Sequence, residues 1–413
     1  MTFEKLLAGK FIFREDGSLR PVVRISTYGI ALGVMIVILS IFIVRGFKRE
    51  VEQKINGFVG TVRISNPANN YDQYSLPLKV APAAFNQIDS VSRSLYPEAR
   101  TSTFIDQMAL VKSDSNFCSV VAHGVGSRSD LDFFEQYLVA GRLPNIEEHT
   151  EVLLPRKIAQ KLGISLGDDF ITYYLLGEQV RVRKYNIVGI VDTGFDSYDE
   201  HIAVMGIGGL QRVNGWQQDE VGGVTVTINE RKGAGHLYEA LFNVLAERNE
   251  EKGERYAMFT VEELNYNYFG WLDLLDANVL LILILMVSVA VMTIVTGIVV
   301  LILEKVRAIA TLKALGQHTA SIRRVFLYVA SRIILWGLII GDCLALLLAW
   351  VQKQWHLIPL DASQYYMSYV PISIDFVWLL LTNLGVFVIV LLFTLLPTSI
   401  ISGITPSKSL RFE

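Results

Sequence analysis

Four long stretches of the chain are apolar and almost free of charge, and this feature limits the fold more than any other. A helix rises about 1.5 Å per residue, so about 20 apolar residues cross the roughly 30 Å hydrocarbon core of a bilayer. The four stretches lie at 22–45, 279–303, 326–351 and 376–401. We therefore predict four transmembrane helices.

The composition excludes an ordinary soluble enzyme, because 52% of the residues are hydrophobic and only 19% are charged. The amphipathic segment 1–21 precedes the first span, and no small-residue cleavage site follows it, so we expect an anchor that is not cleaved. The two cysteines, Cys118 and Cys343, fall in the polar middle of the chain and inside a span. A disulfide framework is not expected.

Lysine and arginine residues indicate the orientation of the spans. They cluster before the first span and in the 304–325 segment, whereas the 352–375 loop has only Lys353. The positive-inside rule then places both termini, including the 402–413 tail, and the 304–325 segment in the cytoplasm. Residues 46–275 and 352–375 are predicted to lie on the outer side of the membrane.

Residues 47–275 carry 22 basic and 31 acidic side chains, and this acidic balance argues against nucleic-acid binding. The segment alternates β-branched and aromatic runs with a few helical patterns, which predicts a large α+β domain with a split subdomain. The strand-like runs are 61–64, 103–111, 119–122, 170–175, 185–191 and 223–228, and the helical patterns are 83–95, 157–162 and 235–249.

No catalytic, metal or cofactor motif is found in the sequence. The six histidines are scattered, and neither H-E-x-x-H nor G-x-x-x-x-G-K-[ST] occurs. The acidic run 196–200 fits a surface turn better than a cation site. If the chain works with ATP, we expect another polypeptide to bind the ATP and magnesium.

Small and polar residues stand out inside the spans. Gly29 and Gly33, and Gly337 and Gly341, are spaced four apart, so each pair forms a groove for another helix, either within the chain or in a dimer. Asp342 lies within the third span. An intramembrane carboxylate is either a functional residue or the hydrogen-bond partner of a neighbouring helix.

The segment 304–316 resembles the coupling segment of the lipoprotein-releasing permease family of LolC/LolE type, within the wider group of MacB-like and FtsX-like four-helix permeases. Segments 10–14, 45–51, 152–168 and 405–411 are similar to the same family in the same order. The residues that we expect to contact an ATPase are Glu304, Lys305, Arg307, Ile309, Leu312, Lys313, Leu315 and Gly316. A short amphipathic helix of this kind can insert into a groove, and Gly316 is expected to end it.

The resemblance implies an inner-membrane permease with a MacB-like periplasmic domain inserted between its first two spans. It implies a cytoplasmic ABC ATPase dimer, a second permease subunit that is identical or a LolC/LolE-like paralogue, membrane lipid, and lipoprotein cargo. ATPase closure would then extract the cargo mechanically. The alternatives are a MacB-like efflux permease and an FtsX-like signalling subunit.

The place of the long carrier-binding hairpin of LolC-type subunits is taken here by a tight turn, Leu176–Gln179. Capture of a periplasmic carrier is therefore not expected at this hairpin, and docking elsewhere stays open. Candidate cargo-facing residues lie on the first two spans, with ordinary packing as the alternative. They are Met35, Ile38, Phe42, Met286, Val289 and Met292.

Overall fold

The computed structural model describes residues 3–13, 18–69, 75–113, 116–229, 233–252 and 255–403. The chain forms two compact units. The first unit comprises Met1–Lys48, Trp271–Ile358 and Val370–Glu413, and the second comprises Arg49–Gly270 and Pro359–Tyr369. Residues 359–369, within the expected short loop between the last two spans, thus belong to the second unit.

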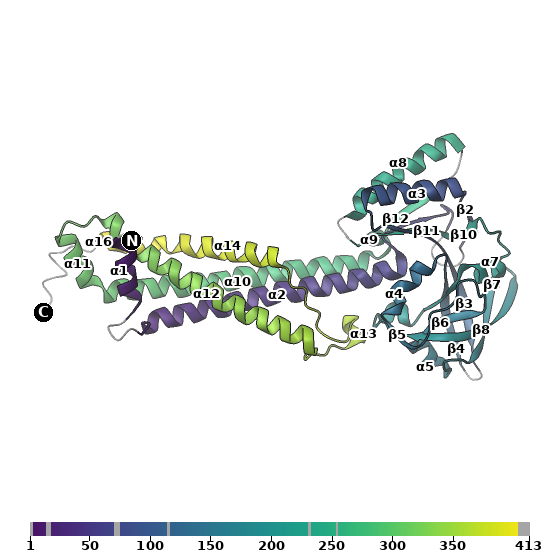
Figure 1. Ribbon diagram of the computed structural model, residues 1–413, viewed down its shortest axis with the longest axis horizontal. Coiled ribbons are helices and arrows are strands. Elements are labelled where there is room, and N and C mark those ends of the chain that lie inside the picture. Colours follow the sequence, from purple (N-terminus) through teal and green to yellow (C-terminus); the bar gives the residue numbers. More distant parts are fainter. Residues whose placement is uncertain are drawn as a thin grey trace. The chain divides into compact units, whose positions relative to one another are not determined.

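Long helices dominate the first unit, and they run alongside one another (Figure 1). Four are long and apolar enough to cross a membrane: α2 (Pro21–Val59), α10 (Tyr266–Glu304), α12 (Thr319–Trp355) and the run Phe376–Ser402 that contains α14 (Phe376–Phe393). Each overlaps one predicted span. The shorter helices are α1 (Phe3–Ile12), α11 (Val306–Ala314), α15 (Leu395–Thr398) and α16 (Ile400–Gly403).

Helices α2 and α10 are much longer than a membrane requires. Each has 39 residues, or about 58 Å at the usual helical rise, against a hydrocarbon core of roughly 30 Å. Beyond its apolar stretch α2 continues because Val51, Ile55 and Phe58 repeat at helical spacing and are buried. The helix ends before Gly60, whose φ of +80° is accessible to glycine.

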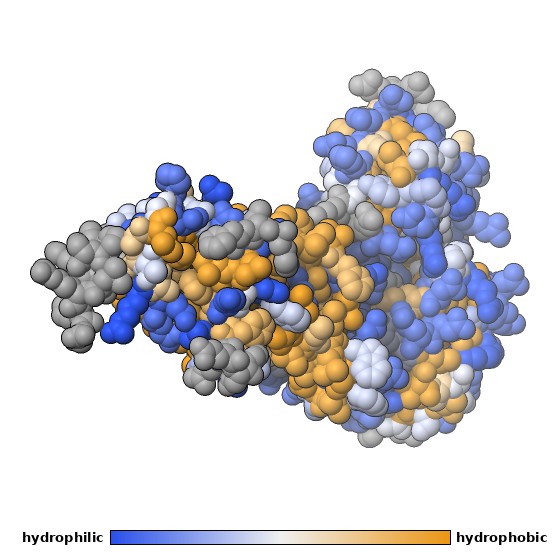
Figure 2. Space-filling model, turned by 60° about the vertical axis from the view of Figure 1, so that its left-hand side comes forward, coloured by the Kyte–Doolittle hydropathy of each residue, from blue (hydrophilic) through white to orange (hydrophobic). Residues whose placement is uncertain are grey.

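The core of the first unit is built around α2. Its buried side chains include Ile30 and Phe42, and they share one cluster with Ile294 of α10 and Phe326 and Ile334 of α12. Helix α1 joins this cluster through Phe11, whose ring centre lies 5.6 Å from that of Phe326. Other apolar side chains of the helices point outward, and Figure 2 shows hydrophobic surface gathered over them.

The second unit contains a ten-stranded mixed sheet in the order β12-β1-β11-β3-β4-β9-β6-β8-β5, with β7 paired to β3 and β8. Strands β4 and β9, and β6 and β8, pair in parallel. The strands are β1 (Val62–Ser65), β3 (Arg100–Lys112), β4 (Phe117–Val125), β5 (Leu138–Gly141), β6 (Glu151–Pro155), β7 (Asp169–Leu176), β8 (Gln179–Val191), β9 (Ile202–Gly206), β11 (Gly223–Thr227) and β12 (Ala257–Thr260), with β2 (Leu78–Lys79) and β10 (Glu220–Val221) forming a separate pair.

Helices cover the sheet in several places. Near β1 and β11, helices α3 (Pro82–Leu95) and α8 (Ala234–Lys252) lie side by side (Figure 1) and enclose one hydrophobic cluster. A second cluster lies between α5 (Arg156–Leu162), α7 (Ile207–Asn214) and the strands from β3 to β9. The remaining short helices are η1 (Arg128–Leu131), α4 (Asp132–Glu135), α6 (Asp196–Asp199), α9 (Val261–Leu264) and α13 (Ala362–Tyr365). The α+β class and all nine predicted elements of this domain are confirmed.

The hairpin between β7 and β8 is as short as the sequence predicts. Leu176 pairs with Gln179, so only Gly177 and Glu178 form the turn. Gly177 has a φ of +60° and makes the reversal possible.

Candidate functional site

Helix α11 is fixed to the first unit and also presents an outer face. Ile309 and Ala310 are fully buried. The Nζ atom of Lys313 donates to the carbonyl oxygens of Ile401, at 2.6 Å, and Ser402, at 3.4 Å. As expected, Gly316 follows the helix end with a φ of +88°. These contacts attach α11 to the helix bundle.

The exposed face of α11 is formed by Arg307, Thr311, Ala314 and Leu315, the last with 79% of its surface exposed. Ile309, Leu312 and Leu315 are the apolar residues that we expected to contact an ATPase, and they are not equally exposed. Ile309 is buried and Leu312 is partly buried, because the other helices of the chain cover that side. Only Leu315 of the three is an exposed apolar residue.

Two more of the predicted coupling residues contact the chain itself. Glu304 forms an ion pair with Arg20 at 3.3 Å. The Nζ atom of Lys305 lies 5.7 Å from the ring centre of Phe11. Both residues therefore help to connect the end of α10 with α1 and the start of α2.

The two glycine pairs lie at contacts within the chain. A Cβ atom on Gly337 or Gly341 would come within 2.7 Å of Ile30 Cγ2 or the Ala31 carbonyl oxygen of α2. A Cβ on Gly29 would lie 3.1 Å from the Thr293 side chain of α10, and Gly33 faces the Met286 carbonyl oxygen at 3.8 Å. This geometry favours the within-chain alternative, with α2 between α10 and α12.

The candidate cargo-facing residues separate into two groups. Ile38 and Phe42 are buried among the helices of the same chain, which favours the alternative of ordinary packing for both. Met35 and Met286 are partly buried against the same core. Val289 and Met292 of α10 are exposed, so they alone of the six offer open apolar surface in this chain.

Asp342 of α12 has its partner on α14. Its Oδ2 atom accepts a hydrogen bond of 2.7 Å from Nδ2 of Asn383, a residue that the sequence analysis did not single out although it is polar and lies within a span. The Oδ1 atoms of both residues are buried and have no hydrogen-bond partner among the described residues. The hydrogen bond connects α12 with α14. This favours the alternative in which Asp342 is the hydrogen-bond partner of a neighbouring helix over the alternative of a functional residue.

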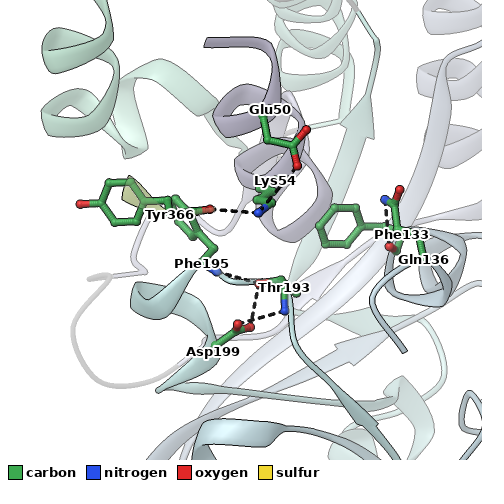
Figure 3. A network of polar contacts seen from close by, with 8 residues as sticks. All are labelled: Glu50, Lys54, Phe133, Gln136, Thr193, Phe195, Asp199 and Tyr366. Carbon is green, nitrogen blue, oxygen red and sulfur yellow. Dashed lines mark hydrogen bonds and ion pairs between the residues drawn. The ribbon is translucent and has the colours of Figure 1, made fainter. Parts of the chain in front are cut away.

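A polar network in the second unit joins the outer end of α2 to residues 359–369 (Figure 3). Lys54 is only 3% exposed, and its Nζ donates to the carbonyl oxygen of Tyr366 at 2.9 Å. Glu50, one turn earlier, lies 3.7 Å from the same ammonium group. Lys54 was not among the residues predicted from the sequence to be functional.

Asp199 lies beside this network and is buried. It accepts hydrogen bonds from the Thr193 amide, at 3.0 Å, and from the Thr193 hydroxyl, at 2.8 Å. Burial raises the pKa of the Asp199 carboxyl to about 6. The other acids of the 196–200 turn, Asp196 and Glu200, pair with Lys157, and no metal-binding cluster is found in the part of the chain that the structure describes.

Two family models match the chain. The model described as MacB-like periplasmic core domain matches residues 25–237, more than half of the chain. The model described as FtsX-like permease C-terminal matches residues 278–406. The predicted tail motif at 405–411 lies outside the described residues, so its structure adds nothing to this match.

Several relatives align over almost their full length. A lipoprotein-releasing system transmembrane protein LolC of Xylella fastidiosa (strain 9a5c) is 21% identical over 97% of this chain and 96% of its own length. LolC of Neisseria meningitidis serogroup B is 22% identical over the same shares. LolE of Haemophilus influenzae is 21% identical over 94% of each chain.

Two solved structures are similar to part of the chain. The extracellular domain of the noncanonic ABC-type transporter YknZ from Gram-positive bacteria is 15% identical and covers 48% of this chain and 100% of its own, with a TM-score of 0.33. A domain of a putative permease from Porphyromonas gingivalis is 17% identical and covers 48% and 88%, with a TM-score of 0.29.

Proposed function

The chain belongs to the family of permeases with a MacB-like periplasmic core domain and an FtsX-like C-terminal region, and we propose from this that it is the membrane subunit of an ABC transporter that releases lipoproteins from the inner membrane. Relatives named as lipoprotein-releasing LolC and LolE proteins match over nearly their whole length, which supports this cargo class. Both termini and α11 are cytoplasmic, and the second unit is periplasmic.

The main support for the proposal is that one side of α11 packs against the helix bundle while the other side is exposed. Buried Ile309 and the Lys313 contacts attach the helix to the bundle, while Leu315 projects into solvent. An exposed apolar residue on a rigid helix suits insertion into a groove of a partner protein. We assign that partner as a cytoplasmic ATPase dimer, which binds the ATP and magnesium.

The long helices provide a path for the motion. Helices α2 and α10 run without interruption from the first unit into the second. Closure of the ATPase dimer would tilt these helices at α11 and move the outer domain. A second permease subunit, identical or paralogous, would complete the complex, and cargo would leave through a lateral opening beside the exposed residues Val289 and Met292.

The substitution Leu315→Asp tests this assignment. A charge at the centre of an apolar contact is expected to weaken ATPase binding about tenfold or more. The measurements are co-purification of the cognate ATPase and ATP-driven release of an acylated lipoprotein from proteoliposomes. Leu357→Asp is the matched control, since Leu357 is 63% exposed but follows α12 at its other end.

Binding and release at the wild-type level in Leu315→Asp would contradict the docking role of α11. Release of a small hydrophobic molecule by the wild-type complex, without release of lipoprotein, would instead support the efflux alternative.

A further inference from the structure

The two ends of the segment that connects α12 with α14 are hydrogen-bonded to each other within the first unit. Gln352 of α12 is 5% exposed, and its side chain accepts from the Ile358 amide at 3.1 Å and donates to the Val370 carbonyl at 3.2 Å. The Val370 amide also donates to the Ile358 carbonyl at 3.1 Å. Residues 359–369, the outer loop, therefore leave and re-enter the first unit at one fixed point.

The tip of the outer loop is held within the second unit. The Tyr366 ring lies 4.8 Å from the ring centre of Phe195 and 5.7 Å from that of Tyr268. Met367 is 3% exposed. Tyr366 also has a φ of +60°, a left-handed conformation that is rare for an aromatic residue and that persists only where surrounding contacts impose it.

Lys54 holds the backbone of this tip. A buried ammonium group needs hydrogen-bond or ionic partners, since it has lost its water. The Tyr366 carbonyl, at 2.9 Å, makes the shortest of its contacts; Glu50 lies at 3.7 Å and the Tyr137 ring centre at 5.5 Å. Figure 3 shows the Lys54 side chain directed from α2 toward Tyr366.

We propose that the outer loop is a mechanical link that fastens α12 and α14 to the outer end of α2 through Lys54. This inference rests on the proposed function. Helices α2 and α10 enter the second unit as continuous helices, but α12 ends at Trp355 and α14 begins at Phe376, both inside the first unit. The outer loop gives this helix pair its own attachment to the domain that moves.

Lys54→Met in the full chain with its ATPase tests the link. Methionine keeps an apolar stem of similar length but has no donor, so the loop should detach more often. We expect exchange of the Leu360 amide, which donates to the Ser368 carbonyl at 2.9 Å, to accelerate about tenfold. Lipoprotein release should fall at least fivefold, and ATPase binding should not change because α11 is intact.

Lys79→Met is the matched control, since Lys79 lies in the same unit, is exposed, and contacts Glu220 at 3.7 Å. If Lys54→Met does not fold, Tyr366→Gly replaces it, because glycine tolerates the positive φ and removes only the ring contacts. Unchanged exchange, or faster exchange with normal release, would overturn the link.

Failure of the proposed function has a different signature, because the wild-type complex would then release no lipoprotein. In that case, hydrogen exchange of the Leu360 amide alone tests the mechanical link. A change in Leu360 protection on addition of a non-hydrolysable ATP analogue, seen in wild type and lost in Lys54→Met, supports it. Equal responses in the two proteins refute it.

Discussion

At the scale of single residues, Asp199 is the clearest case of a side chain whose charge works against burial. It accepts two hydrogen bonds from Thr193, and the Thr193 hydroxyl in turn accepts from the Phe195 amide at 3.1 Å. Burial raises its pKa to about 6, and the neighbouring Asp192 carboxylate adds to the shift. The network thereby shapes the turn that carries Phe195 toward the outer loop.

Asp199 should make the protein less stable as the pH rises from about 4 to about 6. Its folded pKa of about 6 lies above the unfolded value of about 3.9, so the folded state binds the proton more tightly. The free energy of unfolding then falls across this window by up to about 3 kcal/mol and stays low above it. Asp199→Asn, which cannot ionise, should remove this decrease.

The measurement is the thermal unfolding midpoint of both full-length proteins in detergent across this pH range. Lys54, Tyr137 and Asp192 interact electrostatically with the Asp199 carboxyl, and all three are present in both proteins. The difference between the two profiles therefore isolates Asp199. Parallel profiles would contradict the prediction.

At the scale of helices, close approach of α12 to α2 depends on Gly341. An added Cβ would lie 2.7 Å from the Ala31 carbonyl oxygen and 3.0 Å from Val34 Cβ, and backbone atoms of a packed helix cannot move aside freely. Gly341→Ala should therefore destabilise the protein by about 1–3 kcal/mol. A lower unfolding midpoint in detergent is the expected observation.

Gly385→Ala on α14 is the control for this substitution. No atom lies within 4 Å of its added Cβ, and alanine favours a helix over glycine by about 1 kcal/mol. Its midpoint should equal or exceed that of wild type. Equal midpoints for the two variants would show that Gly341 is not a packing contact.

Hydrophobic length and periodicity predicted the four spans and nine elements of the outer domain, but not where helices continue or what covers them. The predicted first span ends at residue 45, whereas α2 continues to Val59 because Val51 and Ile55 are buried. Short apolar strands such as β6 and β9 were missed because four or five residues do not distinguish strand from helix. Ile309 and Leu315 were both expected to contact an ATPase, yet only tertiary packing decides that Ile309 is buried and Leu315 is exposed.

At the scale of the whole molecule, composition predicted a membrane part and a large outer domain, but not the membership of residues 359–369 in the second unit. The contact between Lys54 and Tyr366 spans 312 positions of sequence, and no local pattern encodes it. Contacts of this kind decide which segments can move together, so they matter most if the chain works by the mechanical coupling proposed above.

The proposed release function predicts what happens when the chain is depleted from the bacterial cell. Each buried CH₂ group of an acyl chain contributes about 0.8 kcal/mol, so a chain of about 15 such groups is held by roughly 12 kcal/mol and does not leave the bilayer unaided. Acylated outer-membrane lipoproteins should therefore accumulate in the inner membrane after depletion, as measured by membrane fractionation. Outer-membrane β-barrel proteins, which have no acyl anchor, are the control and should localise normally, whereas normal lipoprotein localisation would rule out the release function.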